Sequence, residues 1–294
     1  MGDSPYRLWR ADGRTLMNPI LLAILSMVST GTSDLIYKRA RSKGIAPSSF
    51  LPIQAAFFNA TTLFLFAHFR IEMPSRTVLF GIGCGLLLYL STHLFLKSLG
   101  EGQASVNVPI FRLSFIPTAL MAFLILRETV TPGKVLAILL SAISILSLSK
   151  DLLTRPRRGN MPFHLISAML LYGLFGLLYK IAVDGGAAPI GIVTAQGAAF
   201  ITIAFALAIS KRSLRIDRLV LSHAPFCGIL LASAFLLLLE SLKHGDVSVS
   251  FSIVQLSFVF TSALAILVWR EEVKAPKIFG ISVAALSVLL FAHV

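Results

Sequence analysis

One arginine, Arg112, lies inside a long run of apolar residues that extends from about residue 104 to residue 126. A charge near the centre of a membrane costs at least about 2.5 kcal/mol, so this side chain must face protein or water rather than lipid. Its planar guanidinium can bind both oxygens of a carboxylate or phosphate, which suits recognition of an anionic group. Arg112 therefore either holds the acidic group of a solute in a cavity or forms a structural ion pair with Asp34.

A carboxylate and an imidazole are expected at a similar membrane depth. Asp34 ends the polar patch 29–34 in the first apolar run, and His93 lies in the third run. Together with Arg112, these groups could move a proton during transport. In the alternative interpretation, Asp34 is solvated near the membrane surface and His93 only packs against its neighbours.

Five uncharged polar residues inside apolar runs complete the set of candidates for lining a cavity. They are Gln54, Gln196, Tyr172, Asn107 and Gln255, of which Gln54 and Gln196 are equivalent to each other and Gln255 is equivalent to Arg112 in the internal repeat described below. Polar side chains in membrane helices often only bond a neighbouring helix, so packing is the alternative role for each of them.

Catalytic motifs are absent from the sequence. There is no HExxH, GxSxG or CxxC pattern, and Asp34 is the only acid clearly inside an apolar run. We therefore predict no catalytic residue, no metal and no cofactor. Glu128 and Glu271 each end a run beside Arg127 or Arg270, which suggests local ion pairs at the membrane surface.

The composition is that of a membrane protein. Hydrophobic residues make up 56% of the 294 residues and charged residues 13%, whereas soluble domains carry about 25% charge. Runs of roughly 20 apolar residues suit membrane-spanning helices rather than the short alternating strands of a barrel. Ten such runs are present, at 17–37, 49–69, 77–97, 104–126, 134–150, 162–182, 190–209, 220–240, 248–269 and 276–293.

The chain contains the same module twice. Lys97 to Lys134 matches Glu240 to Lys277 at 16 of 38 positions, and Leu35 to Phe58 matches Leu177 to Phe200 at ten of 24. Because each copy has five spans, an odd number, the second copy must enter the membrane from the opposite side. The sequence therefore predicts an all-α integral membrane protein of two inverted five-helix repeats, an arrangement that places a substrate site between the halves.

The domain boundaries follow from this repeat. We predict a polar N-terminal segment at 1–16, a first repeat at 17–150, a charged linker at 151–160 and a second repeat at 161–294.

Positive charge lies between the spans. The net charge is +13, and the side opposite the two termini carries 16 Lys and Arg residues against nine on the terminal side. This placement indicates contact with anionic lipid and excludes nucleic acid as the expected partner. Read alone, the count puts both termini outside the cytoplasm.

These features resemble the EamA-like members of the drug/metabolite transporter superfamily, over residues 20–294. The segments SLGEGQASV and LRETVTPGK in the first copy, and SLKHGDVSV and WREEVKAPK in the second, carry the resemblance. It implies a secondary carrier with a central cavity and with both termini in the cytoplasm, against the charge count. The Trp-Gly pair frequent in the first helix of this family is replaced here by residues 31–34, so the resemblance implies no particular substrate.

We therefore expect a multi-pass protein of the bacterial inner (plasma) membrane, a monomer or homodimer. Its expected function is alternating-access transport, in the export direction, of a small polar or anionic organic solute such as an amino acid or metabolite. The cavity is expected between spans one, three, four, six, eight and nine. A flippase for a lipid-linked substrate is the alternative within transport, and a membrane-embedded enzyme is the alternative outside it.

Overall fold

The computed structural model describes residues 10–11, 14–15, 18–45, 47–70, 72–101, 104–148, 163–210, 217–269 and 275–294. Nearly all of them are helical. The exception to the all-α prediction is a pair of two-residue antiparallel strands, β1 (Arg10–Ala11) and β2 (Arg14–Thr15), near the N-terminus. The predicted linker at 151–160, and Arg270 and Glu271 at the end of the ninth span, lie outside the described residues.

The first repeat consists of five spans. Spans one to three are α1 (Pro19–Ser42), α2 (Pro47–Phe69) and α3 (Ser75–Glu101). Span four is made of α4 (Ala104–Arg112), α5 (Phe115–Met121) and the π-helical turn η2 (Ala122–Leu126), and span five is α6 (Pro132–Ser147).

The second repeat has the same order. Spans six and seven are α8 (Phe163–Asp184) and α9 (Pro189–Ser210). Span eight is formed by the short α10 (Arg218–Leu221) and α11 (Ala224–His244), span nine by α12 (Val247–Gln255) and α13 (Ser257–Trp269), and span ten by α14 (Ala275–Phe291).

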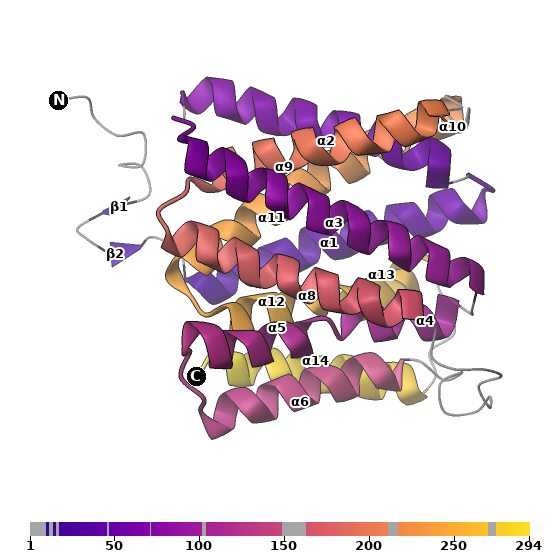
Figure 1. The fold of residues 1–294 in the computed structure, drawn as a ribbon. Coiled ribbons are helices and arrows are strands. Elements are labelled where there is room, and N and C mark those ends of the chain that lie inside the picture. The colour runs from indigo at the N-terminus through magenta and orange to yellow at the C-terminus, as the bar shows by residue number, and fades with distance from the viewer. Residues whose placement is uncertain are drawn as a thin grey trace.

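These helices form one bundle in which neighbouring spans run in opposite directions, and the start of α1 and the C-terminus lie at the same end of it (Figure 1). We call this end the terminal face, and the other end, which includes the α1–α2 connection, the opposite face. Eight spans are long and apolar enough to cross a membrane, while α6 and α14 have 16 and 17 residues. At a rise of about 1.5 Å per residue these two helices extend about 25 Å, slightly less than a bilayer core.

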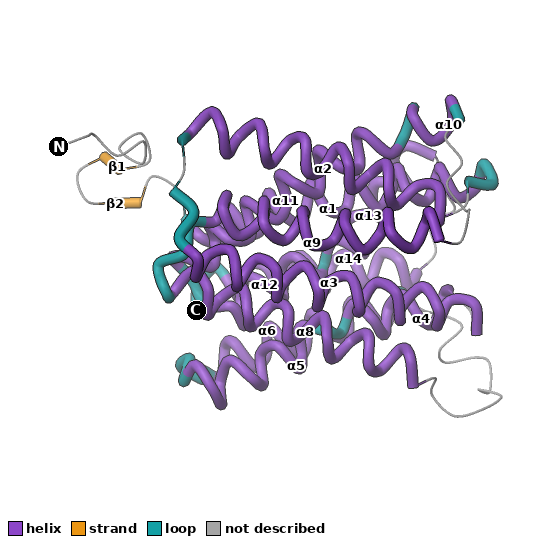
Figure 2. Tube along the Cα trace, turned by 45° about the horizontal axis from the view of Figure 1, so that its top comes forward, coloured by secondary structure: helices purple, strands orange, loops and turns teal. Residues whose placement is uncertain are grey.

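The two short spans pack against each other through serines. Ser141 and Ser287 share a hydrogen bond of 2.7 Å between their hydroxyls, and the Ser144 hydroxyl donates to the Gly280 carbonyl at 2.6 Å. Figure 2 shows that helix accounts for almost the whole described chain, with short loops at the two ends of the bundle. The prediction of an all-α, inverted-repeat membrane fold is confirmed.

Equivalent breaks interrupt spans four and nine, which the sequence analysis did not predict. In span four, tight turns at Leu113 and Ser114 separate α4 from α5, and in span nine a turn at Leu256 separates α12 from α13. Arg112 and Gln255 are the last helical residues before these breaks. A cationic side chain at the end of a half-helix is stabilised by the negative end of the helix dipole.

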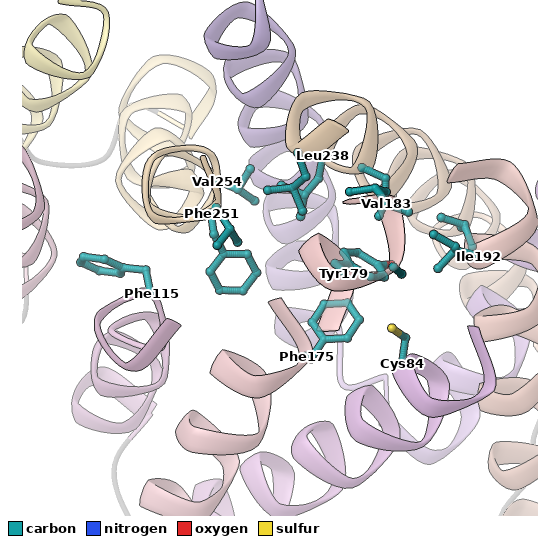
Figure 3. Close-up of a cluster of buried hydrophobic side chains, with 14 of the residues drawn as sticks. Cys84, Phe115, Phe175, Tyr179, Val183, Ile192, Leu238, Phe251 and Val254 are labelled. Carbon is teal, nitrogen blue, oxygen red and sulfur yellow. The ribbon is translucent and has the colours of Figure 1, made fainter. Parts of the chain in front are cut away.

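Aromatic side chains of α8 form the centre of the buried core (Figure 3). Phe175 and Tyr179 are fully buried with ring centroids 4.3 Å apart, and they lie among Cys84 of α3, Leu238 of α11 and Phe251 of α12. The main core therefore joins helices of both repeats, which holds the two halves in register around the middle of the bundle.

Two glycines of α3 allow close contact with α9. A Cβ atom at Gly81 would lie 2.4 Å from the Ala195 Cβ, and one at Gly85 would lie 2.6 Å from the Gln196 carbonyl oxygen. Such distances are below van der Waals contact, so any larger residue would push the helices apart. This contact fixes the position of the α9 segment that carries Gln196.

Candidate functional site

A cavity of about 220 Å³ lies in the middle of the bundle. It extends toward the opposite face, where Leu51 and Phe95 line it. Its other lining residues are Thr30, Asp34, Gln54, Ala55, Phe58, Asn59, Leu88, Thr92, Phe111, Arg112, Tyr172, Gln196, Gly197, Phe200, Leu231 and Phe235. Spans one to four and six to eight contribute these residues. The expectation that span nine lines the cavity is wrong, and spans two and seven, which were left out, provide several of its polar groups.

Arg112 and Asp34 meet at the cavity wall. Nη2 of Arg112 donates to Oδ2 of Asp34 at 2.5 Å, with 13% of the arginine and 33% of the aspartate side chain exposed. The two interpretations of Arg112 are therefore compatible, since the ion pair itself lines the cavity. The described residues that line the cavity include no other charged side chain.

Arg112 also bonds its counterpart in the second repeat. Its Nη1 donates to Oε1 of the fully buried Gln255 at 3.4 Å, while Nε2 of Gln255 has no hydrogen-bond partner in the described chain. Because these residues are equivalent in the two copies, their contact lies on the pseudo-two-fold axis between the repeats. Gln255 supports Arg112 from behind the cavity rather than lining it.

Three of the predicted polar residues do line the cavity. Gln54 lies on α2, and Gln196 on α9 accepts a hydrogen bond at Oε1 from the Tyr179 hydroxyl. Tyr172 on α8 packs its ring against Phe111, with centroids 5.1 Å apart, and against Phe251, at 5.6 Å. The structure therefore brings together Gln54, Gln196 and Tyr172 with Arg112 and Asp34.

His93 and Asn107 lie elsewhere. His93 is exposed on the outside of α3, where its ring stacks against Tyr89 at 6.1 Å. Asn107 is 3% exposed, and its side-chain amide donates to the Ser98 carbonyl at 2.6 Å. Neither lines the cavity, because a residue's depth in a span does not determine which side of the helix it occupies.

Asn59 is a lining residue that the sequence analysis missed. Its side-chain amide donates to the carbonyls of Ala55, at 2.8 Å, and Gly197, at 3.0 Å, and so joins α2 to α9. An asparagine in the middle of an apolar run was the available signal. The aromatic part of the lining, which includes Phe58, Phe200 and Phe235, gave no signal because it resembles ordinary core sequence.

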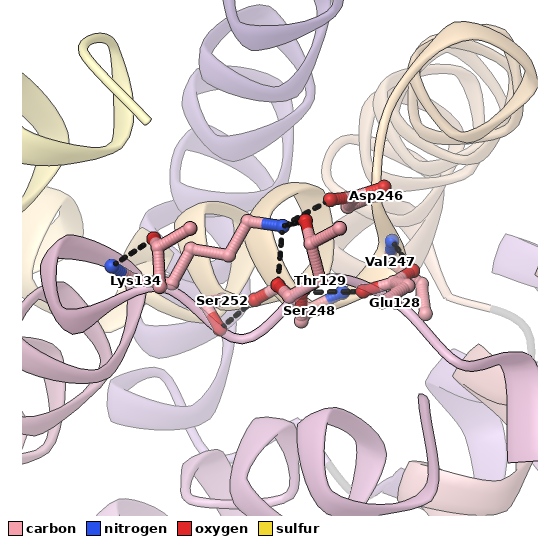
Figure 4. A network of polar contacts seen from close by, with 8 residues as sticks. Glu128, Thr129, Lys134, Asp246, Val247, Ser248 and Ser252 are labelled. Atoms are coloured by element: carbon pink, nitrogen blue, oxygen red, sulfur yellow. Dashed lines mark hydrogen bonds and ion pairs between the residues drawn. The ribbon is translucent and has the colours of Figure 1, made fainter. Parts of the chain in front are cut away.

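On the terminal face, polar contacts fasten the first repeat to the second (Figure 4). The Glu128 carboxylate accepts hydrogen bonds from the backbone N–H groups of Val247, at 2.7 Å, and Ser248, at 3.2 Å, and from the Ser248 hydroxyl at 2.5 Å. It thereby caps the N-terminus of α12, where unpaired N–H groups and the helix dipole favour an anion.

Lys134 completes this set of contacts, which we call the Glu128 clasp. Its ammonium forms an ion pair with Asp246 and donates to the Thr129 carbonyl at 2.9 Å, and its side chain is 3% exposed. The expectation of a local surface pair between Glu128 and Arg127 is therefore wrong, since the Glu128 carboxylate crosses to the other repeat.

The model of the EamA-like transporter family matches residues 17–150 and again residues 161–292. The chain belongs to the EamA-like transporter family. It is therefore a multi-pass integral membrane protein of the drug/metabolite transporter superfamily.

Two further proteins are similar to this chain. An uncharacterized protein of Haemophilus influenzae is 27% identical over 192 residues, a match that covers 59% of this chain and 62% of that protein. A protein of known crystal structure superposes with a TM-score of 0.79 at 13% identity, covering 92% of this chain and 95% of that one. At this identity the superposition shows that the two proteins share a fold.

Proposed function

We propose that this EamA-like protein is a secondary transporter that exports a small polar or anionic organic solute, such as an amino acid or related metabolite, by alternating access. The observation that carries this proposal is the position of Arg112. Its guanidinium lies at the wall of a central cavity and on the axis that relates the two repeats. Its planar fork of donors matches the oxygens of an acidic group such as a carboxylate or phosphate.

The lining favours a solute with both polar and apolar parts. Arg112, Asp34, Gln54 and Gln196 provide hydrogen-bonding groups, while aromatic rings and leucines form much of the remaining wall. A volume of about 220 Å³ lies below the roughly 300 to 1,000 Å³ of sites for drug-sized ligands, so a solute of metabolite size fits.

The two charges in the wall further favour a solute with both signs of charge. A carboxylate on Arg112 and an ammonium on Asp34 would leave every charge paired, and buried charges require partners. A simple anion would compete with Asp34 for the same guanidinium. Among acidic solutes, the site therefore favours zwitterions.

Alternating access is supported by the different states of the two faces. The Glu128 clasp joins the repeats at the terminal face, whereas the cavity extends toward the opposite face. Rocking of one repeat against the other would release the clasp and expose the cavity on the terminal side.

The test is counterflow in proteoliposomes loaded with a mixed pool of amino acids and organic acids. Arg112→Gln should abolish exchange of the transported class while the protein remains folded in detergent. The control is Arg76→Gln, which removes an exposed arginine at the start of α3 and should leave exchange unchanged. Undiminished exchange by Arg112→Gln would remove this residue from the site. Folded wild-type protein that exchanges no member of the pool would contradict transport of such solutes, and co-purified lipid would then favour a flippase.

A further inference from the structure

The cavity holds its charges as a matched pair, and both charges belong to the first repeat. The equivalent of Arg112 in the second copy is Gln255, and the alignment that pairs Leu35 with Leu177 places Gly176 opposite Asp34. At Gly176 there is no space for a side chain, since a Cβ atom would lie 2.8 Å from the Phe251 ring. The acid and the base are therefore present together in one copy and absent together from the other, which indicates that they act as a unit.

A carrier that moves solute in one direction must return empty. During this return the cavity is closed to water on both sides, and a lone charge inside it would carry the penalty of an unpaired buried ion. Arg112 alone would present such a charge, because its other side-chain partner, Gln255, is neutral. With Asp34 at 2.5 Å, the empty site contains a paired, net neutral couple.

We propose that Asp34 is a built-in counter-ion that occupies Arg112 when the cavity is empty and thereby allows the unloaded protein to reorient. This inference rests on the proposed function and adds its regulation: the protein performs net transport and is not restricted to exchange. Asp34 acts here by neutralising Arg112, which makes it a positioning residue for the return step.

The geometry allows a bound solute to replace this contact. Asp34 is the more exposed member of the pair, at 33% of its side chain against 13% for Arg112, so its carboxylate can turn into the cavity while Arg112 stays on Gln255. The solute's carboxylate then takes the Nη2 position, and its ammonium pairs with Asp34. The loaded and empty forms are both neutral, so both can pass through the closed state.

The experiment compares net efflux with exchange, for the same protein and at saturating solute, in proteoliposomes. Net efflux requires the empty return, whereas exchange does not. In Asp34→Asn the solute is a carboxylate that lacks an ammonium group, because Asp34 pairs with the ammonium of a zwitterion. The empty site of this variant carries one unpaired positive charge, whereas its loaded site is neutral, since Arg112 pairs with the solute. We expect the ratio of net efflux to exchange to fall at least about tenfold, since an unpaired buried charge slows the return of the empty site.

Two control variants accompany Asp34→Asn. Asp34→Glu keeps the charge and should keep the wild-type ratio within about twofold. Glu240→Gln removes an acid that lies near Lys243 at the end of α11, outside the cavity lining, and should also leave the ratio unchanged. A wild-type ratio in Asp34→Asn, or parallel loss of both fluxes, would overturn the proposal. If wild-type protein shows no exchange at all, the proposed function fails instead.

A measurement on the unmodified protein tests the same idea. Net efflux of a zwitterion should be insensitive to an imposed membrane potential, because neither crossing step moves net charge through the site. Acceleration or arrest of net efflux by an imposed membrane potential would contradict a neutral empty site.

Discussion

Replacing Glu128 with glutamine removes the charge from the carboxylate that caps α12. Three hydrogen bonds reach this group: from the backbone N–H groups of Val247 and Ser248, and from the Ser248 hydroxyl. Bonds to charged groups contribute about 1.5 to 3 kcal/mol each, roughly twice as much as neutral ones. Glutamine is expected to weaken each of these bonds by about half and to lose the interaction with the helix dipole. At a partly exposed site, the free energy of unfolding should therefore fall by about 2 kcal/mol.

Thermal unfolding in detergent at a fixed scan rate measures this loss. At about 2 to 4 °C per kcal/mol for a protein of this size, Glu128→Gln should unfold about 4 to 8 °C below wild type. Ser248→Ala removes one whole bond to the carboxylate, whereas Glu128→Gln weakens three bonds by half, so it should shift the midpoint about two thirds as far. The matched control is Glu72→Gln, since Glu72 is an exposed acid in the α2–α3 loop on the same face. If Glu128→Gln and Glu72→Gln unfold together with wild type, the cap does not stabilise the closed terminal face.

The packing around the cavity also predicts the effects of three substitutions. Gly85→Leu should lower the unfolding midpoint by several degrees, because its side chain meets the α9 backbone and overpacking costs about 1 to 3 kcal/mol; an unchanged midpoint would contradict the close contact. His93→Ala should leave exchange within about twofold of wild type, because this side chain faces away from the cavity, and loss of exchange would return it to the site. Tyr179→Phe removes the hydroxyl that holds the Gln196 side chain, so it should raise the half-saturating solute concentration roughly tenfold. An unchanged half-saturating concentration would show that Gln196 does not contact the solute.

The membrane fold could be predicted because the signals for it are local or repeated. A span is a run of apolar residues that is long enough to cross the bilayer. The inverted repeat follows from a direct match between segments such as Lys97 to Lys134 and Glu240 to Lys277. The breaks at Ser114 and Leu256 escaped prediction, because apolar composition continues through them and only the path of the backbone changes.

The cavity could be predicted in part. Arg112 was identified because a charge inside a span needs a partner, and Asp34 was the only acid clearly inside a run. Which other polar residues join them depends on the rotation of each helix, which the sequence pattern leaves open when apolar residues surround the helix on all sides. That is why Gln54, Gln196 and Tyr172 line the cavity while His93 and Asn107 do not.

By itself, the sequence determined the membrane class, the number of spans, the duplication and the presence of one buried arginine, because each of these follows from composition along the chain. Only the tertiary structure decided the contacts between the repeats. Glu128 reaches α12 across more than a hundred residues of sequence, and Arg112 meets both Asp34 and Gln255. These contacts depend on how two inverted halves meet, and no local pattern of residues encodes which side chains face one another across that boundary.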